Sequence, residues 1–110
     1  MKQGEIWELY LNPTKGSEQS GRKPVVIISG NLMNTYLQVV IVCPLTTSIK
    51  NYKGNLILNP DKTNGLEKTS EVLTFHVRSV SKTRLDKKIG KIPLKDVEVI
   101  KKTLNDILKF

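Results

Sequence analysis

The sequence predicts a small, mostly β fold: an antiparallel barrel with one amphipathic helix packed on it at the C-terminus. Short apolar segments alternate with turn residues along most of the chain, as they do in barrels built from short strands. Only the last stretch, beyond Pro93, has apolar residues at helical spacing. A length of 110 residues is that of one domain with a modest core, so we expect residues 1–110 to form a single domain.

Three strands are expected in the first half of the chain. Residues 6–11 combine aromatic and aliphatic side chains and end at a turn signal. Residues 14–24 form a polar loop with glycines and cations, and long loops of this kind are often functional. The apolar residues 25–29 and 38–43 are typical of buried strands, and Pro44 is expected to end the second of them.

The second half adds a short strand over residues 55–58 and a longer one over residues 70–80. Side chains alternate along a strand, so the longer strand has two different faces. One face is expected to join the core: Leu73, Phe75 and Val77. The other face is polar enough to line a site: Thr74, His76 and Arg78.

A basic turn or short helix is expected over residues 82–88, and a last edge strand over residues 88–92. The segment beyond Pro93 predicts an amphipathic helix, with acidic residues early and a lysine late, as the helix dipole favours. Its apolar positions share one face: Val97, Ile100, Leu104, Ile107 and Leu108. This helix closes the predicted barrel.

The chain carries a net charge of +8, which indicates an anionic partner, with nucleic acid the leading class. Cys43 is the single cysteine and lies in an apolar run, so we expect a buried thiol without redox chemistry. No segment approaches the roughly 18 apolar residues of a membrane span, and the N-terminus lacks a secretory signal. We therefore expect a cytoplasmic protein that does not bind membranes.

One short motif in the chain is unusually specific: the run Pro-Thr-Lys-Gly-Ser-Glu-Gln, within residues 12–19, goes far beyond what a turn composition would give. Further motifs lie at residues 4–7, 24–29, 42–47, 77–80 and 82–85, and the terminal helix completes the order. Together these motifs resemble the MazF/PemK family of bacterial toxins, and the resemblance covers nearly the whole chain.

The resemblance implies an SH3-like barrel that forms a homodimer, with an RNA groove across the dimer and an acidic antitoxin that occupies the groove. It also implies a sequence-specific ribonuclease that cleaves single-stranded RNA without a metal or other cofactor. The ribose 2′-hydroxyl would attack the adjacent phosphate and leave a 2′,3′-cyclic phosphate and a 5′-hydroxyl. The sequence shows no convincing metal-ligand spacing, which is consistent with that route.

By position in the motif, the resemblance implies a catalytic arginine immediately before the strand proline and a partner threonine, Thr46. Lys23 occupies the arginine position, and Arg22 precedes it. Arginine offers a bidentate fork to phosphate whereas lysine offers one mobile charge, so the exchange is not conservative. Two interpretations stand, with a slight preference for the first: a shifted loop brings Arg22 to the phosphate, or Lys23 acts instead.

The identity of the residue that acts as general base is also open. Many relatives carry an acidic residue followed by glutamine where this chain has Phe75 and His76. His76 is one candidate, because histidine exchanges protons at physiological pH. Glu18 is the other, with the alternative that its carboxylate only holds Arg22 and Lys23 in position.

Further residues are expected to contact the RNA through phosphate charges or hydrogen bonds: Lys15, Ser17, Gln19, Thr47, Arg78 and Lys82. A competing hypothesis is a non-catalytic protein on the same barrel, either a nucleic-acid-binding domain or a gyrase-poisoning toxin like CcdB. The CcdB toxins depend on a C-terminal tryptophan, and residues 105–110 contain none, which disfavours the gyrase alternative.

Overall fold

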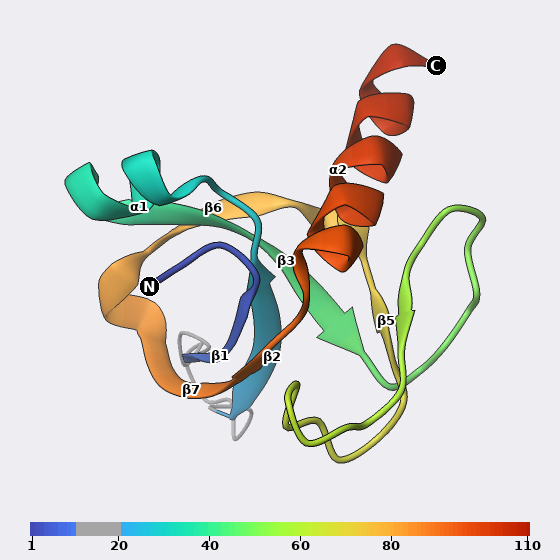
Figure 1. Cartoon of the computed structure of the whole chain (residues 1–110), viewed down its shortest axis with the longest axis horizontal. Coiled ribbons are helices and arrows are strands. Elements are labelled where there is room, and N and C mark those ends of the chain that lie inside the picture. The colour runs from blue at the N-terminus through green and yellow to red at the C-terminus, as the bar shows by residue number, and fades with distance from the viewer. Residues whose placement is uncertain (11–20) are drawn as a thin grey trace, which may run out of the picture.

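The computed structural model describes residues 1–10 and 21–110. The strands in these residues are β1 (Glu5–Tyr10), β2 (Arg22–Ile27), β3 (Val39–Thr46), β4 (Ile57–Leu58), β5 (Ser70–Val72), β6 (Arg78–Ser81) and β7 (Leu85–Lys91). The helices are α1 (Asn31–Tyr36) and α2 (Leu94–Lys109), together with the short 3₁₀ helices η1 (Thr74–His76) and η2 (Lys82–Arg84). Figure 1 shows α2 standing beside the sheet at the end of the chain.

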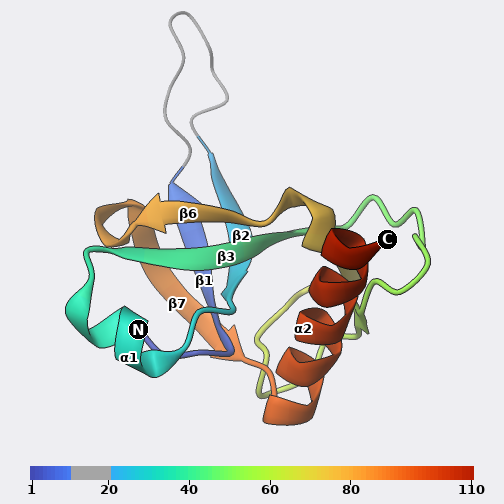
Figure 2. The same ribbon diagram turned by 90° about the horizontal axis from the view of Figure 1, so that it is seen from above.

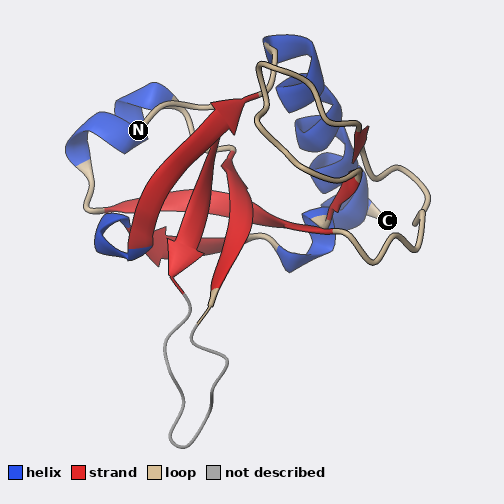
Figure 3. Cartoon of the chain, turned by 90° about the horizontal axis from the view of Figure 1, so that it is seen from below, coloured by secondary structure: helices blue, strands red, loops and turns tan. Residues whose placement is uncertain are grey.

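The strands form one curled, antiparallel sheet in the order β4-β5-β3-β2-β1-β7, and β6 pairs with β3 outside this path. β3 is the central strand. One of its edges pairs with β2, while the other edge pairs first with β6 and then with β5. Figure 3 shows the strands gathered together with the long helix beside them. The prediction of an antiparallel barrel with a C-terminal helix is confirmed.

The core consists of two apolar clusters on the two faces of the sheet. One includes Val26 together with Val97 and Ile100 of α2, and the other includes Val25 and Ile27. Neighbouring residues of β2 therefore face different clusters, and each face is covered. This is why the β2 segment is a continuous apolar run rather than an alternating one.

Helix α2 begins directly after Pro93, as the sequence predicts, and its inner face packs on the sheet. Val97 and Ile100 are each only 1% exposed, and burial of such side chains stabilises the fold by about 1.5–3 kcal/mol apiece. The part of α2 that packs on the sheet is shorter than the apolar face of the helix, since Ile107 and Leu108 at its end are exposed. Figure 2 places α1 and α2 at opposite ends of β3.

Several strand boundaries differ from the prediction, and three of the differences bear on the site. β2 begins at Arg22, so Arg22 and Lys23 belong to the strand and not to the preceding loop. β7 begins at Leu85, earlier than expected. β3 continues through Pro44, which lies where the strand changes partner from β6 to β5, and the Pro44 carbonyl accepts a hydrogen bond from the Leu73 amide at 2.8 Å. A proline is tolerated at such an interruption of the ladder.

Candidate functional site

A hollow of about 230 Å³ gathers three cationic or titratable side chains from three elements. Lys23 comes from β2, His76 from η1 and Arg78 from β6. The remaining lining is apolar: Leu9, Val25, Val42 and Pro44. Charged side chains against low-dielectric walls attract an anion more strongly than they would in open water. This hollow is the candidate functional site.

Strand geometry decides which of the two adjacent cations reaches the hollow. Lys23 pairs with Leu9 across the β1–β2 ladder, and both line the hollow. Arg22 pairs with Tyr10 and therefore projects from the opposite face. There the Arg22 guanidinium lies 2.5 Å from the Asp86 carboxylate and 3.9 Å from that of Glu8. The structure thus places Lys23, and not Arg22, beside His76 and Arg78.

Thr46 is the last residue of β3 and lies on the face of the sheet that carries the hollow. It follows Pro44 by two residues, so the two share a face of the strand. The β2–β3 pairing ends at Val25 and Pro44. Extended by two residues, the same register places Thr46 opposite Lys23. The Thr46 Oγ1 atom accepts a hydrogen bond from the Ser48 amide at 3.1 Å. Its hydroxyl proton remains able to donate to a ligand oxygen.

The expected continuous strand over residues 70–80 is wrong, and so is the pattern of its two faces. The 3₁₀ helix η1 interrupts the strand, and its three-residue turn replaces the two-residue alternation. Thr74, expected on the polar face, is fully buried, whereas Phe75, expected in the core, is 46% exposed. His76 still reaches the candidate site together with Arg78.

A buried carboxylate, which the sequence analysis did not single out, holds the loop beside this site. Glu71 of β5 accepts hydrogen bonds of 2.8–3.0 Å from the amides of Lys50, Asn51 and Tyr52 and from the Asn55 side chain. Burial opposes ionisation of Glu71, but these four donors outweigh it and hold its pKa below the usual range. The only signal in the sequence is an acidic residue inside an apolar strand segment.

The other predicted contact residues are dispersed. Glu18, Lys15, Ser17 and Gln19 lie outside the described residues. Thr47 lines a second hollow, of about 390 Å³, which also contacts Glu8 and Pro24 on the opposite face of β1 and β2. Lys82 begins η2, beyond the end of β6 that is remote from Arg78. The site hollow therefore collects only part of the expected set.

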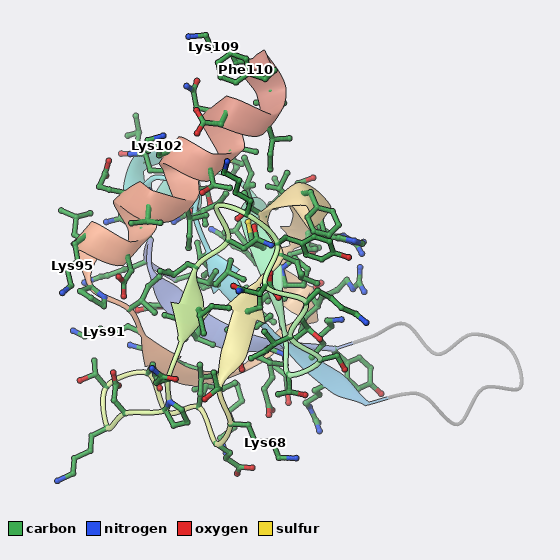
Figure 4. All side chains as sticks on the ribbon, turned by 90° about the vertical axis from the view of Figure 1, so that its right-hand side faces the viewer. Lys68, Lys91, Lys95, Lys102, Lys109 and Phe110 are labelled. Atoms are coloured by element: carbon green, nitrogen blue, oxygen red, sulfur yellow. The ribbon has the colours of Figure 1, made fainter. Side chains whose placement is uncertain are left out.

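Positive charge is spread over the whole molecule. Figure 4 shows lysines along the length of α2, one at the end of β7 and one on a loop below the helix. The labelled lysines are Lys68, Lys91, Lys95, Lys102 and Lys109. Two of the α2 lysines pair with acidic residues of the same helix. Charge alone does not locate the site, which is defined by the convergence of Lys23, His76 and Arg78.

Three further observations concern the described part of the chain. No group of three or more histidine, cysteine, aspartate or glutamate side chains is arranged to hold a metal ion there. No helix there is long and apolar enough to span a bilayer. Cys43 is fully buried, and burial raises the pKa of its thiol to about 12, which agrees with its predicted place in the core.

Comparison with known families assigns the chain to a class of toxins. Residues 2–108 match the family described as PemK-like, MazF-like toxin of type II toxin-antitoxin system, and the chain belongs to this family. Two relatives illustrate the similarity. Endoribonuclease MazF9 of Mycobacterium tuberculosis is 30% identical over 84% of this chain and 82% of its own length. Endoribonuclease MazF of Staphylococcus saprophyticus is 36% identical over 81% of this chain and 75% of its own length.

Solved structures agree with this assignment. The chain superimposes on a crystal structure of MazE-MazF from Deinococcus radiodurans with a TM-score of 0.83 and 25% identity, covering 98% of this chain and 95% of that one. Mycobacterium tuberculosis toxin MazF-mt6 has the same fold, with a TM-score of 0.78 over 96% of this chain and 97% of its own. The predicted family is therefore confirmed.

Proposed function

We propose that this toxin is an endoribonuclease that cleaves single-stranded RNA by internal transesterification. The observation that carries the proposal is the convergence of Lys23, His76 and Arg78 in one hollow, on the strand face that Thr46 shares. A phosphodiester needs cations, a hydrogen-bond donor and a proton acceptor for this reaction, and these four residues supply them. Relatives named endoribonucleases support the assignment.

Each of these side chains has a distinct part in the reaction. The ribose 2′-oxygen bonds to the adjacent phosphorus while the bond from phosphorus to the 5′-oxygen breaks. His76 takes the proton from the 2′-hydroxyl, and the leaving 5′-oxygen gains a proton from solvent or from protonated His76. Lys23 and Arg78 neutralise the extra negative charge of the phosphorane, and the Thr46 hydroxyl donates to one of its oxygens. The products are a 2′,3′-cyclic phosphate and a 5′-hydroxyl.

We further propose that the toxin acts in the cytoplasm as a homodimer and that an acidic antitoxin neutralises it. The net charge of +8 favours both RNA and an acidic polypeptide as partners. The exposed apolar side chains near the end of α2, such as Leu108, are compatible with burial against a second subunit. Sedimentation of the purified protein tests the dimer, and co-purification with the product of a neighbouring gene tests the antitoxin.

The decisive experiment is incubation of the purified protein with a mixed-sequence single-stranded RNA in excess EDTA, followed by analysis of the fragment ends. We expect cyclic phosphates and 5′-hydroxyls, and we expect Thr46→Ala and His76→Ala to abolish most of the cleavage while they still bind RNA. Thr47→Ala is the matched control, because Thr47 lines the other hollow. RNA binding without cleavage would instead indicate a non-catalytic toxin-fold protein.

A further inference from the structure

Phe75 is an apolar side chain that the fold holds at the surface beside the candidate active site. Its residue surface is 46% exposed, although Thr74 immediately before it is fully buried. The turn of η1 produces this exchange, since it directs the hydroxyl inward and the phenyl ring outward. A single exposed apolar side chain is normal on a protein surface. Phe75 is informative because its ring packs with two neighbouring rings, one of which lines the candidate site.

Phe75 is the central ring of an aromatic row. The Tyr52 ring packs edge-to-face against it, with centroids 5.2 Å apart and an angle of 79°. The His76 ring lies on its other flank, with centroids 4.5 Å apart and an angle of 61°. Tyr52 is itself 48% exposed, and its backbone amide is tied to the buried Glu71 carboxylate at 2.9 Å. The row is thus held in place before any ligand arrives, which lowers the entropic cost of binding.

The row continues directly from the phosphate-binding hollow. His76 belongs to both, since it lines the hollow with Lys23 and Arg78 and also contacts Phe75. A single strand of RNA with its phosphate in the hollow would carry a neighbouring base onto this row. Every base has a π face, so an aromatic platform with adjacent cations suits single-stranded nucleic acid.

We propose that Phe75, supported by Tyr52 and His76, stacks on the nucleobase of a nucleotide that flanks the scissile phosphate. This inference rests on the proposed endoribonuclease function and adds a binding contact to it. Stacking tolerates different bases, so Phe75 supplies affinity and alignment of the strand rather than hydrogen-bond recognition. Phe75 contacts no reacting atom, and its contribution is to binding.

The test separates stacking from cleavage. An RNA oligonucleotide spanning a mapped cleavage site carries 2-aminopurine beside the scissile phosphate and a 2′-deoxyribose at the scissile nucleotide, which blocks the reaction. Binding to the wild-type protein should quench the 2-aminopurine fluorescence. Phe75→Leu should lose most of this quenching, and its Kd for the oligonucleotide should rise about fivefold or more. Phe75→Trp should keep the quenching and the affinity of the wild-type protein.

Two further measurements distinguish a stacking contact from a structural effect or a phosphate contact. Phe75→Leu should leave the slope of log Kd against log salt unchanged, because no phosphate contact is lost. Tyr36→Leu on α1 is the matched control, since it removes an aromatic ring that is 75% exposed on another element, and it should bind like the wild type. Tyr52→Leu provides a second variant of the row if Phe75→Leu does not fold.

Wild-type affinity and quenching in both Phe75→Leu and Tyr52→Leu would overturn the proposal. So would an unchanged RNA affinity combined with weakened binding of an acidic peptide, since the row would then serve a protein partner. If natural RNA is cleaved but no base is quenched, stacking fails while the endoribonuclease stands. If no RNA is cleaved, single-stranded RNAs carrying 2-aminopurine at successive positions replace this probe; quenching by the wild type that Phe75→Leu loses means that the platform stands and the proposed chemistry fails.

Discussion

The two adjacent cations of β2 provide the sharpest test of the proposed site. Lys23→Gln and Arg22→Gln each remove one positive charge, so each lowers the general attraction for RNA by a similar amount. The two native side chains point to opposite faces of the sheet. Lys23 lines the hollow with His76 and Arg78, whereas Arg22 pairs with Asp86 on the other face. The two variants should therefore differ in cleavage far more than in binding.

The magnitudes follow from these surroundings. Loss of one preorganised group that stabilises transition-state charge typically lowers the rate by roughly 10²–10³, and we expect this of Lys23→Gln. The Arg22–Asp86 pair is half exposed, with side chains 47% and 44% accessible, so its contribution to stability is about 0–1 kcal/mol. Arg22→Gln should then keep a cleavage rate within about threefold of the wild type.

Single-turnover cleavage at saturating protein measures the chemical step, and affinity for a 2′-deoxy-blocked oligonucleotide measures binding. Lys23→Arg should retain or raise activity, because a guanidinium binds phosphate through two donors. If Arg22→Gln lowers the cleavage rate as much as Lys23→Gln does, the assignment of Lys23 alone as the catalytic cation of β2 is refuted.

Three other predictions concern stability and reactivity. Thr74→Val should stabilise the fold by about 1 kcal/mol, since the buried Thr74 Oγ1 has no hydrogen-bond partner in the described part of the chain, and thermal unfolding should show a Tm about 4 °C higher. Glu71 has a lowered pKa, so its stabilising contribution is complete above the ordinary value of about 4.3 and is lost as the pH falls through the lowered value. The free energy of unfolding, measured with urea at several pH values across this range, should therefore fall less steeply with falling pH in Glu71→Gln than in the wild type. Cys43, with its thiol pKa raised to about 12, should resist a thiol reagent at about pH 8 until the protein is unfolded.

Much of the fold was predictable because it depends on local patterns. Apolar residues at helical spacing beyond Pro93 predicted α2, and the continuous apolar run in β2 predicted a buried strand. The Pro-Thr-Lys-Gly-Ser-Glu-Gln run was specific enough to indicate the toxin family. Thr46 was found by its position in the motif, and its place on the face of the hollow supports the role proposed for it.

The errors share one physical cause. Periodicity describes neighbours two to four residues apart, whereas strand ends and side-chain direction depend on partners far away in the sequence. Residues 70–80 were apolar and alternating enough for one strand, yet β3 pairs with β5 and β6 separately, and η1 bridges the gap between them. The exposure of Phe75 follows from that break.

Local patterns in the chain were enough to establish the family, the C-terminal helix, the buried strands and the residue types available for chemistry. Long-range contacts were needed to establish that Lys23 and not Arg22 faces His76 and Arg78, because this depends on where β2 begins and on its register with β1. They were also needed to show that Glu71 anchors the loop carrying Tyr52, since a carboxylate acquires its distant amide donors only when the chain brings them together.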